Sequence, residues 1–368
     1  MANDEQDELG DEIRHRISLN GPLNIARYMS LCLSHSEHGY YMTRDPLGVL
    51  GDFTTAPEIS QIFGEIIGLW TAYIWQAIGA PTRLQLVELG PGRGTLMADA
   101  LRAIRAAAPN CMAALDLHLI ETSPVLRAKQ AEALAASGIS PHWHDKVQAV
   151  PLGAAVFLAN EFFDALPIHQ YQRVDKGWRE ILVTNDGQGG FAPGLSGMPA
   201  KQSYLPRAYH DAPIGAIAEI SPARDAVMKA IAERLSRQAG AALIIDYGHL
   251  ATAPGDTLQA VREHDYVSPF EAPGKADLTS HVDFGQLARI TEKAGATAHP
   301  PLTQGAFLKA LGIEARAAML RTGADADQSA AIEAAVKRLT DDDAMGHLFK
   351  VLCVTSRTPE PPAPFAAA

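Results

Sequence analysis

Cysteine is scarce in this sequence: Cys32, Cys111 and Cys353 are the only three in 368 residues, and no two of them form a C-x-x-C pair. A disulfide framework needs an even set of cysteines, and cysteine-based zinc sites need closely spaced pairs. The composition therefore argues against both, and it is typical of a reducing compartment. The histidine clusters His35/His38 and His142/His144 have no matching second cluster, so we expect no metal site.

Long hydrophobic runs and a basic leader are missing as well. The longest apolar stretch, residues 66–80, is too short and too interrupted to predict a membrane span. The first 17 residues are acidic, whereas a secretory or mitochondrial targeting segment would be basic. From these two observations we expect a cytoplasmic protein with no membrane partner.

Positive charge is also in deficit, with 31 Lys and Arg against 42 Asp and Glu, for a formal net charge of -11. A nucleic-acid backbone attracts basic surfaces, so nucleic acid is an unfavoured partner, and a basic protein segment suits this balance better. The sequence motifs G-x-S-x-G and H-E-x-x-H are both absent, which removes the commonest hydrolase signals.

Apolar residues, by contrast, make up 47% of the chain, and many fall in short runs. Buried runs that alternate with helix-like stretches predict a parallel sheet covered on both faces, an α/β fold of the doubly wound, Rossmann-like kind. Ligands of such sheets bind at the carboxyl ends of the strands. Four runs end in or near polar residues, so we expect these side chains to converge on one edge; the runs are 84–90, 115–121, 155–160 and 241–248.

Two further regions complete the predicted organisation. Residues 1–80 are expected to form an N-terminal helical addition with a lid loop, and residues 81–357 the core. Within that core, turns at 175–177 and 185–187 predict an inserted antiparallel β region over about 168–220, where substrate recognition is expected. The proline- and alanine-rich tail, 358–368, and residues 1–10 are expected to be disordered.

One helix start is strongly marked. Thr55 and Glu58 have the T-x-x-E spacing of a capping box, with Pro57 inside the first turn. Apolar residues from Ile59 to Ile74 then recur at helical spacing. We expect a single helix that begins at Thr55 and buries this stripe against the core.

The glycine motif E-L-G-P-G-R-G follows the first buried run. A dinucleotide site needs G-x-G-x-x-G, but Thr95 occupies the third glycine position, and no glycine here precedes lysine as in a P-loop. The spacing instead places Glu88 before Gly90, Gly92 and Gly94, a pattern typical of S-adenosyl-L-methionine (SAM) methyltransferases. Glycines let the backbone lie against the methionine portion, and Glu88 suits its ammonium.

Two further groups of acidic residues suit the same ligand. Glu121 ends the second buried run, where a carboxylate can accept two hydrogen bonds from ribose hydroxyls. Asn160, Glu161 and Asp164 lie in FLANEFFDALP, at the end of a later run, and we expect them to face the methyl acceptor. A glycine-rich turn without a ligand, and a capped strand end with Asp164 merely exposed, are the structural alternatives.

Several blocks in a fixed order resemble one family. The blocks GDFTTAPEISQIFGE, LVELGPGRGTL, FLANEFFDALPIHQY, LIIDYG, PGKADLTSHVDF and QGAFLKALGI together are similar to the MidA-type SAM-dependent methyltransferases. That family includes a mitochondrial complex I assembly factor that is a protein arginine methyltransferase. The resemblance extends from about Gly21 to Arg357.

The resemblance implies a class I methyltransferase with SAM as cofactor, acting on an arginine of a complex I subunit or a similar protein. It implies SAM contacts at the three motif glycines and a cofactor lid or wall at Gly51 and Asp52. A homodimer remains open. Two alternatives also stay open: a SAM-binding assembly factor without catalysis, and a small-molecule methyltransferase.

An arginine acceptor sets a chemical requirement. Its guanidinium stays protonated, and carboxylates that bind it orient one nitrogen toward the methyl donor. We therefore expect Glu161, with Asp164 and Asn160 beside it, to orient the substrate.

Overall fold

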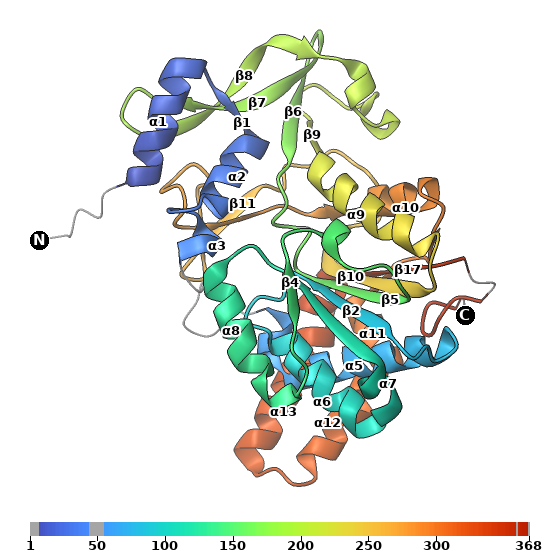
Figure 1. Cartoon of the computed structure of the whole chain (residues 1–368). Coiled ribbons are helices and arrows are strands. Elements are labelled where there is room, and N and C mark those ends of the chain that lie inside the picture. Colours follow the sequence, from blue (N-terminus) through green and yellow to red (C-terminus); the bar gives the residue numbers. More distant parts are fainter. Residues whose placement is uncertain (1–6, 44–54, 358–359, 367–368) are drawn as a thin grey trace, which may run out of the picture. The chain divides into compact units, whose positions relative to one another are not determined.

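The computed structural model describes residues 7–43, 55–357 and 360–366, and it divides the chain into two compact units (Figure 1). The core unit comprises Thr54–Phe163, Ala226–Leu250 and Val282–Ala368. The accessory unit comprises Met1–Phe53, Asp164–Asp225 and Ala251–His281. Each unit is described by itself below.

The core unit is built on a nine-stranded sheet with the order β15-β17-β10-β5-β2-β3-β4, in which β14 pairs with β10 and β16 with β17. Strands β2, β3, β4, β5 and β10 run parallel to one another, and β17 is antiparallel to β10. The strands are β2 (Leu84–Leu89), β3 (Leu115–Ile120), β4 (His142–His144), β5 (Ala155–Asn160), β10 (Gly240–His249), β14 (Val282–Asp283), β15 (Thr297–Ala298), β16 (Leu302–Thr303) and β17 (Phe349–Thr355).

The four buried runs of the sequence are the central strands of this sheet, as predicted. Leu89 pairs in register with Ile120 on one side and with Ala159 on the other, and Asn160 pairs with Ile245. The carboxyl ends of β2, β3, β5 and β10 therefore lie along one edge. This confirms the expected convergence of their polar residues.

Helices α5 and α6 pack against each other unusually closely, because α5 carries glycines where it meets α6. A Cβ built on Gly64 would lie 2.6 Å from the Asp99 Cβ, and one on Gly68 would lie 2.4 Å from the Ala100 carbonyl oxygen. The helices of the core unit are α4 (Ala56–Ile59), α5 (Gln61–Ala77), α6 (Thr95–Ala107), α7 (Pro109–Ala114), α8 (Pro124–Leu134), α10 (Phe284–Lys293), α11 (Gln304–Ala310), α12 (Ile313–Arg321), α13 (Ala326–Thr340) and α14 (Met345–Leu348), together with most of α9 (Pro222–Leu235).

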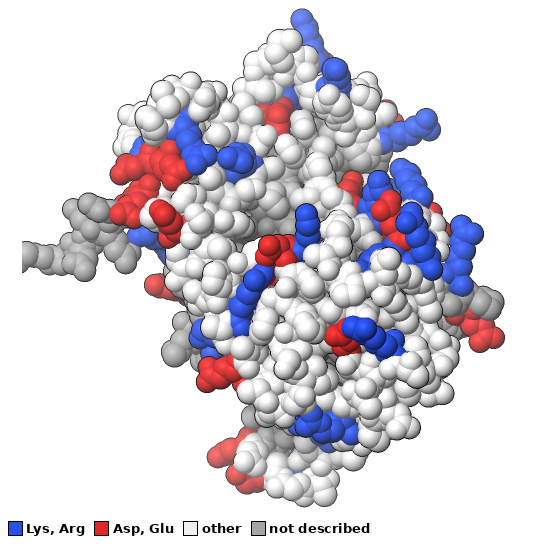
Figure 2. All heavy atoms as spheres, in the orientation of Figure 1, with Lys and Arg blue, Asp and Glu red and all other residues white. Residues whose placement is uncertain are grey.

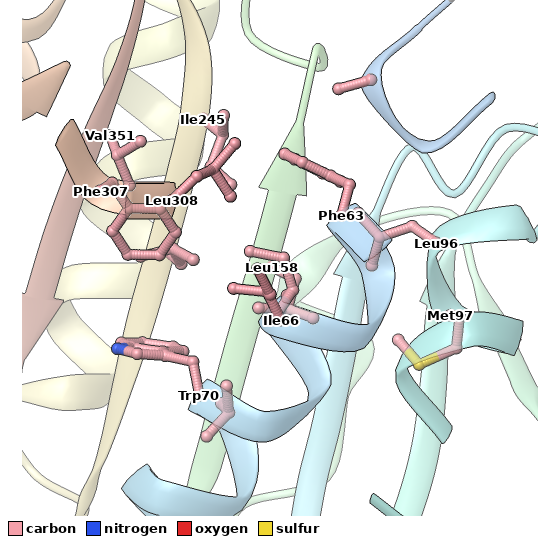
Figure 3. Close-up of a cluster of buried hydrophobic side chains, with 14 of the residues drawn as sticks. Phe63, Ile66, Trp70, Leu96, Met97, Leu158, Ile245, Phe307, Leu308 and Val351 are labelled. Atoms are coloured by element: carbon pink, nitrogen blue, oxygen red, sulfur yellow. The ribbon is translucent and has the colours of Figure 1, made fainter. Parts of the chain in front are cut away.

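The apolar stripe predicted on residues 59–74 is indeed buried. Phe63, Ile66 and Trp70 of α5 lie in one cluster with side chains of α6, α11 and the sheet (Figure 3). Each of these three is at most 2% exposed. Because α5 belongs to this core, the boundary between the units lies before it, not at the expected residue 80.

A helix does begin at Thr55, which is the N-cap residue of α4, but the expectation of one continuous helix to Ile74 is wrong. Ser60 has extended backbone angles (φ -159°, ψ 135°) and interrupts the helix, so that α4 and α5 are separate. The Ser60 hydroxyl caps α5 by accepting from Ile62 N at 3.2 Å. Thr55 makes no side-chain capping bond, and Glu58 contacts Thr95 instead. The Glu58 side chain, which a capping box would use, therefore forms a tertiary contact with α6 instead.

The accessory unit contains the antiparallel insertion that the turn residues predict. Its five-stranded sheet has the order β1-β7-β6-β9, with β8 paired to β7, and its three-stranded sheet has the order β12-β11-β13. The elements are α1 (Glu8–Asn20), α2 (Ile25–Ser34), α3 (Tyr40–Thr43), β1 (Leu23–Asn24), β6 (His169–Val174), β7 (Gly177–Asn185), β8 (Phe191–Ala200), β9 (Ile217–Ile220), β11 (Gln259–Arg262), β12 (Asp265–Val267) and β13 (Asp277–Thr279). The inserted region is thus larger than 168–220, since 251–281 belongs to the same unit.

Both chain ends are more ordered than expected where the structure describes them. Helix α1 already begins at Glu8, capped by Asp7, whose Oδ1 accepts from Gly10 N at 3.1 Å. In the tail, Phe365 is 4% exposed and packs in the core cluster, and Trp70 Nε1 donates to the Ala363 carbonyl oxygen at 3.0 Å. Phe365 is thus a buried aromatic residue in a tail whose proline- and alanine-rich composition predicted disorder.

Charge on the molecular face in Figure 2 is mixed rather than gathered in one large patch of a single sign. Over α1, for example, Arg14 bonds to Asp7 and Asp11, and Arg16 pairs with Glu12. Among the described residues, no helix has both the length and the apolar character to cross a membrane.

Candidate active site

The glycine motif forms the turn between β2 and α6. Gly90, Gly92 and Gly94 all have positive φ, at 62°, 54° and 86°, a region that residues with a Cβ rarely adopt. Gly90 N donates to the Ile120 carbonyl oxygen at 3.0 Å, and Gly94 N to the Pro91 carbonyl oxygen at 2.8 Å. Side chains are excluded here for steric reasons too, because a Cβ on Gly90 would lie 2.7 Å from the Phe162 ring.

Glu88 presents a buried carboxyl group at the end of β2. The residue is 3% exposed, and its Oε2 has no hydrogen-bond partner among the described residues. Burial raises the pKa of this carboxyl from 4.5 to about 8. A buried, unpaired carboxylate is costly, so this position suits a cationic ligand group that would pair with it.

Glu121 ends β3 in a more polar setting. Its Oε1 accepts from Ser123 N at 2.8 Å, and its Oε2 accepts from Gln130 Nε2 at 3.2 Å. Burial raises the pKa of Glu121, and the hydrogen bond from Ser123 opposes that rise. A carboxylate has about four lone-pair sites, so Glu121 keeps some acceptor capacity beyond these hydrogen bonds.

Gln130 is a member of this site that the sequence analysis missed. This fully buried side chain of α8 donates to the Gly92 carbonyl oxygen at 2.8 Å and to Glu121. Its Oε1 accepts from Trp143 Nε1 at 2.8 Å. The glutamine thus joins the glycine turn to the acid of β3. No local motif marks it, because its partners come from three other elements.

The end of β5 holds the second predicted group. Glu161 has φ 49°, in the left-handed region, and its N–H donates to the Ile245 carbonyl oxygen at 2.9 Å. Its Oε1 accepts from Ala56 N at 3.0 Å and from Asn160 Nδ2 at 2.9 Å. Asn160 Oδ1 is buried without a hydrogen-bond partner among the described residues.

Asp246, at the end of β10, is hydrogen-bonded to the turn that follows β5. It is fully buried, and its Oδ2 accepts from Phe163 N at 3.0 Å while its Oδ1 accepts from Tyr247 N at 2.9 Å. Non-glycine residues with positive φ usually persist only where surrounding contacts hold them. The bonds at Ile245 and Asp246 flank Glu161 and supply such contacts.

Three predicted site residues remain. Asp164 is buried in the accessory unit, where its Oδ1 accepts from Ala165 N at 2.9 Å and its carbonyl oxygen accepts from Ser280 N at 3.1 Å. Gly51 and Asp52 lie outside the described residues. The roles given to these three residues remain predictions.

Comparison with known proteins identifies the family of the chain. A family model described as "Putative S-adenosyl-L-methionine-dependent methyltransferase" matches residues 66–302. The chain belongs to this family. The methyltransferase is also 29% identical to a Burkholderia thailandensis protein regarded as a methyl transferase and solved with S-adenosyl-homocysteine bound. That match has a TM-score of 0.87 and covers 98% of this chain and 96% of the other.

Curated relatives carry a more specific name. The chain is 38% identical to the "Protein arginine methyltransferase NDUFAF7 homolog, mitochondrial" of Drosophila melanogaster, over 94% of this chain and 84% of the relative. It is 37% identical to the Homo sapiens "Protein arginine methyltransferase NDUFAF7, mitochondrial", over 84% of this chain and 74% of the relative. These names contradict the expected cytoplasmic location, since both relatives are mitochondrial.

The residues of the core unit fit SAM, the cofactor of this methyltransferase. Glu88 Oε2, which has no partner in the described part of the chain, suits the cationic part of that molecule, and the three glycines adopt backbone conformations that a Cβ disfavours. Glu121 retains acceptor sites for the ribose hydroxyls.

Proposed function

We propose that this methyltransferase transfers the methyl group of SAM to an arginine side chain of a protein. The observation that carries the proposal is the end of β5, where the Glu161 carboxylate accepts from Ala56 N and Asn160 Nδ2. Beside it, Asn160 Oδ1 has no hydrogen-bond partner among the residues that the structure describes. Acceptor groups of this kind suit a guanidinium, which has five N–H donors and no acceptor. The names of the curated relatives support the same substrate class.

The finer description of the fold is part of this proposal. We assign a doubly wound, Rossmann-like class I methyltransferase core, with α1 and α2 as an N-terminal helical addition. The sheet order supports it, because β3 and β4 lie on one side of β2 while β5 and β10 lie on the other. Such a reversal of strand order creates a ligand crevice at the carboxyl ends.

The cofactor-binding residues are proposed from the same edge. Gly90, Gly92 and Gly94 would border the methionine portion, Glu88 its ammonium, and Glu121 the ribose. Gly51 and Asp52 are kept as a proposed wall of the pocket on the strength of the family resemblance.

The chemistry requires positioning more than reactive side chains, because methyl transfer is an in-line displacement at carbon. When bound, SAM supplies an electrophilic methyl group. Glu161 binds the guanidinium and orients one nitrogen, and Asn160 Oδ1 accepts a hydrogen bond from it. Overall, that nitrogen exchanges one proton for the methyl group, and the Glu161 carboxylate takes the proton. Asp164, three residues further along the chain, is proposed as a second orienting acid.

The protein substrate proposed is a respiratory complex I subunit or a similar protein, following the family resemblance. A homodimer is compatible with this activity. A SAM-binding assembly factor without catalysis and a small-molecule methyltransferase are the competing functions, and labelling distinguishes them from a protein methyltransferase.

A labelling experiment tests the assignment of Glu161. The protein is incubated with methyl-labelled SAM and a cell lysate, and labelled proteins are hydrolysed to identify methylarginine. Glu161→Gln should abolish labelling, because the amide lacks the charge that orients the guanidinium, yet it should bind S-adenosyl-homocysteine within about twofold of the parent. Exposed Glu132 provides a matched control, and Glu132→Gln should label normally. Full labelling by Glu161→Gln would refute the role.

A further inference from the structure

Helix α4 makes two sets of contacts within the core unit. Its first residue, Ala56, donates its backbone N–H to Glu161 Oε1 at 3.0 Å. Its third residue, Glu58, accepts from Thr95 Oγ1 at 2.5 Å through Oε1, while Oε2 lies 3.9 Å from Arg93 Nη1. Arg93 and Thr95 flank Gly94 of the glycine turn. One turn of helix therefore contacts both the cofactor turn and the acid at the end of β5.

The backbone separates this helical turn from its neighbour. Ser60 is extended, so α4 is not a continuation of α5 and is held by contacts of its own. Ala56 is fully buried and Pro57 is also buried, which fixes the helix against the core. The carboxylate of Glu58 is then turned toward α6 rather than toward its own N-cap.

Glu161 needs such external support. Its left-handed backbone is unfavourable for a residue with a Cβ, so its geometry depends on the groups that contact it. The Ala56 N–H is one of those groups. A displacement of α4 would move this donor away from the carboxylate.

We propose that Glu58 is a positioning residue that couples the cofactor turn to Glu161 through α4. Glu58 holds Thr95 and Arg93, which fixes α4, and Ala56 in turn fixes the Glu161 carboxylate. Binding of the cofactor and placement of the substrate-facing acid are then linked events. The inference rests on the proposed function only in that Glu161 faces the methyl acceptor.

Hydrogen exchange with S-adenosyl-homocysteine as the probe tests the coupling without any methyl acceptor. In the parent, the ligand should slow amide exchange both in the glycine turn, residues 89–95, and at residues 161–163. In Glu58→Ala the glycine turn should stay protected, while exchange at 161–163 should become about tenfold faster, the order expected for one lost hydrogen bond to a charged group. Thr95→Val removes the donor from the opposite side and should give the same loss.

Two variants separate positioning from general destabilisation. Glu58→Gln keeps an acceptor oxygen for Thr95 and should restore protection at 161–163. Glu132→Ala makes the same change at an exposed glutamate and should behave as the parent. Parent-like protection at 161–163 in both Glu58→Ala and Thr95→Val would overturn the proposal. If Glu58→Ala fails to bind S-adenosyl-homocysteine, the exchange rates at 161–163 in Thr95→Val and Glu58→Gln test the proposal in its place. A lack of arginine methylation would refute the proposed function but leave this result intact.

Discussion

Glu88 is an acidic residue in a buried environment that disfavours its charged form. It has a carboxyl group inside the protein, with one oxygen that lacks a partner among the described residues. Burial alone raises its pKa to about 8, so at neutral pH the ligand-free protein holds this group largely protonated. Ionising Glu88 in the ligand-free protein costs free energy, and a bound cationic group would offset that cost.

Cofactor affinity should therefore depend on pH. A cationic group favours the ionised form of Glu88, so binding must release a proton wherever the group is protonated beforehand. Affinity for S-adenosyl-homocysteine should rise with pH, by up to about tenfold per unit, and level off above about pH 8. Calorimetry at pH 6.5 and 8.5 measures this change. Glu88→Gln should remove most of the pH dependence, and an unchanged slope in that variant would contradict the role of Glu88.

The raised pKa of Glu88 has the opposite effect on folding: the free energy of unfolding falls as the pH rises. A carboxyl whose pKa is raised in the folded state favours folding most below its unfolded pKa, near 4.5, and loses that contribution as the pH rises to about 8. The ligand-free protein should lose stability over this range, and Glu88→Gln should lose less. Urea unfolding at pH 5.5 and 8.5 compares the two proteins. Equal losses would show that Glu88 is not the group responsible.

At the level of elements, glycines allow α5 to pack closely against α6. Gly68 meets the backbone of Ala100, and no side-chain movement can relieve a contact with a carbonyl oxygen. This contact could not be predicted from the sequence, because an isolated glycine within a helical pattern indicates only a lower helix propensity. The need for glycine at position 68 follows from its contact with α6, which is known only from the folded structure.

Gly68→Ala tests which effect dominates. Helix propensity alone would stabilise the variant by about 1 kcal/mol, whereas overpacking costs about 1–3 kcal/mol. Because the new Cβ would lie 2.4 Å from a backbone oxygen, we expect a net loss in the free energy of unfolding. Gly323→Ala, where a Cβ meets nothing within 4 Å, is the matched control. Urea unfolding should rank Gly68→Ala below both the parent and the control; a gain in stability would contradict the packing.

Helix α4 shows the limit of local motifs. The spacing of Thr55 and Glu58 is that of a capping box, yet Glu58 bonds to a residue 37 positions away. Sequence spacing identifies the groups that are able to cap, but a stronger tertiary partner decides whether they do. The three motif glycines, by contrast, all adopt positive φ, a backbone conformation for which glycine itself is the local sequence signal.

For the whole molecule, the central strands and their shared edge were predictable from hydrophobic runs. The pairing of elements distant in sequence was not. Gln130 of α8 joins the glycine turn, and Phe365 anchors the tail, although neither residue stands in a recognisable pattern. Such contacts depend on the assembled fold, which brings together residues that are distant in the sequence.

The tail contributes to the stability of the core unit. Phe365 is 4% exposed and its ring centre lies 5.7 Å from that of Phe307. Phe365→Ala should lower the free energy of unfolding by about 3 kcal/mol, as for other buried aromatic residues. Leu152, which is 77% exposed, is the control, and Leu152→Ala should change the value by no more than about 0.5 kcal/mol. Equal effects of the two changes, measured by urea unfolding, would place the tail outside the core.

The central claim is that this methyltransferase modifies arginine in a protein. Mass spectrometry of a mitochondrial extract, after incubation with the protein and methyl-deuterated SAM, tests it most directly. Deuterated methyl groups are expected on arginine side chains with the parent and none with Glu161→Gln. Label confined to small molecules, to other side chains, or absent altogether would contradict it.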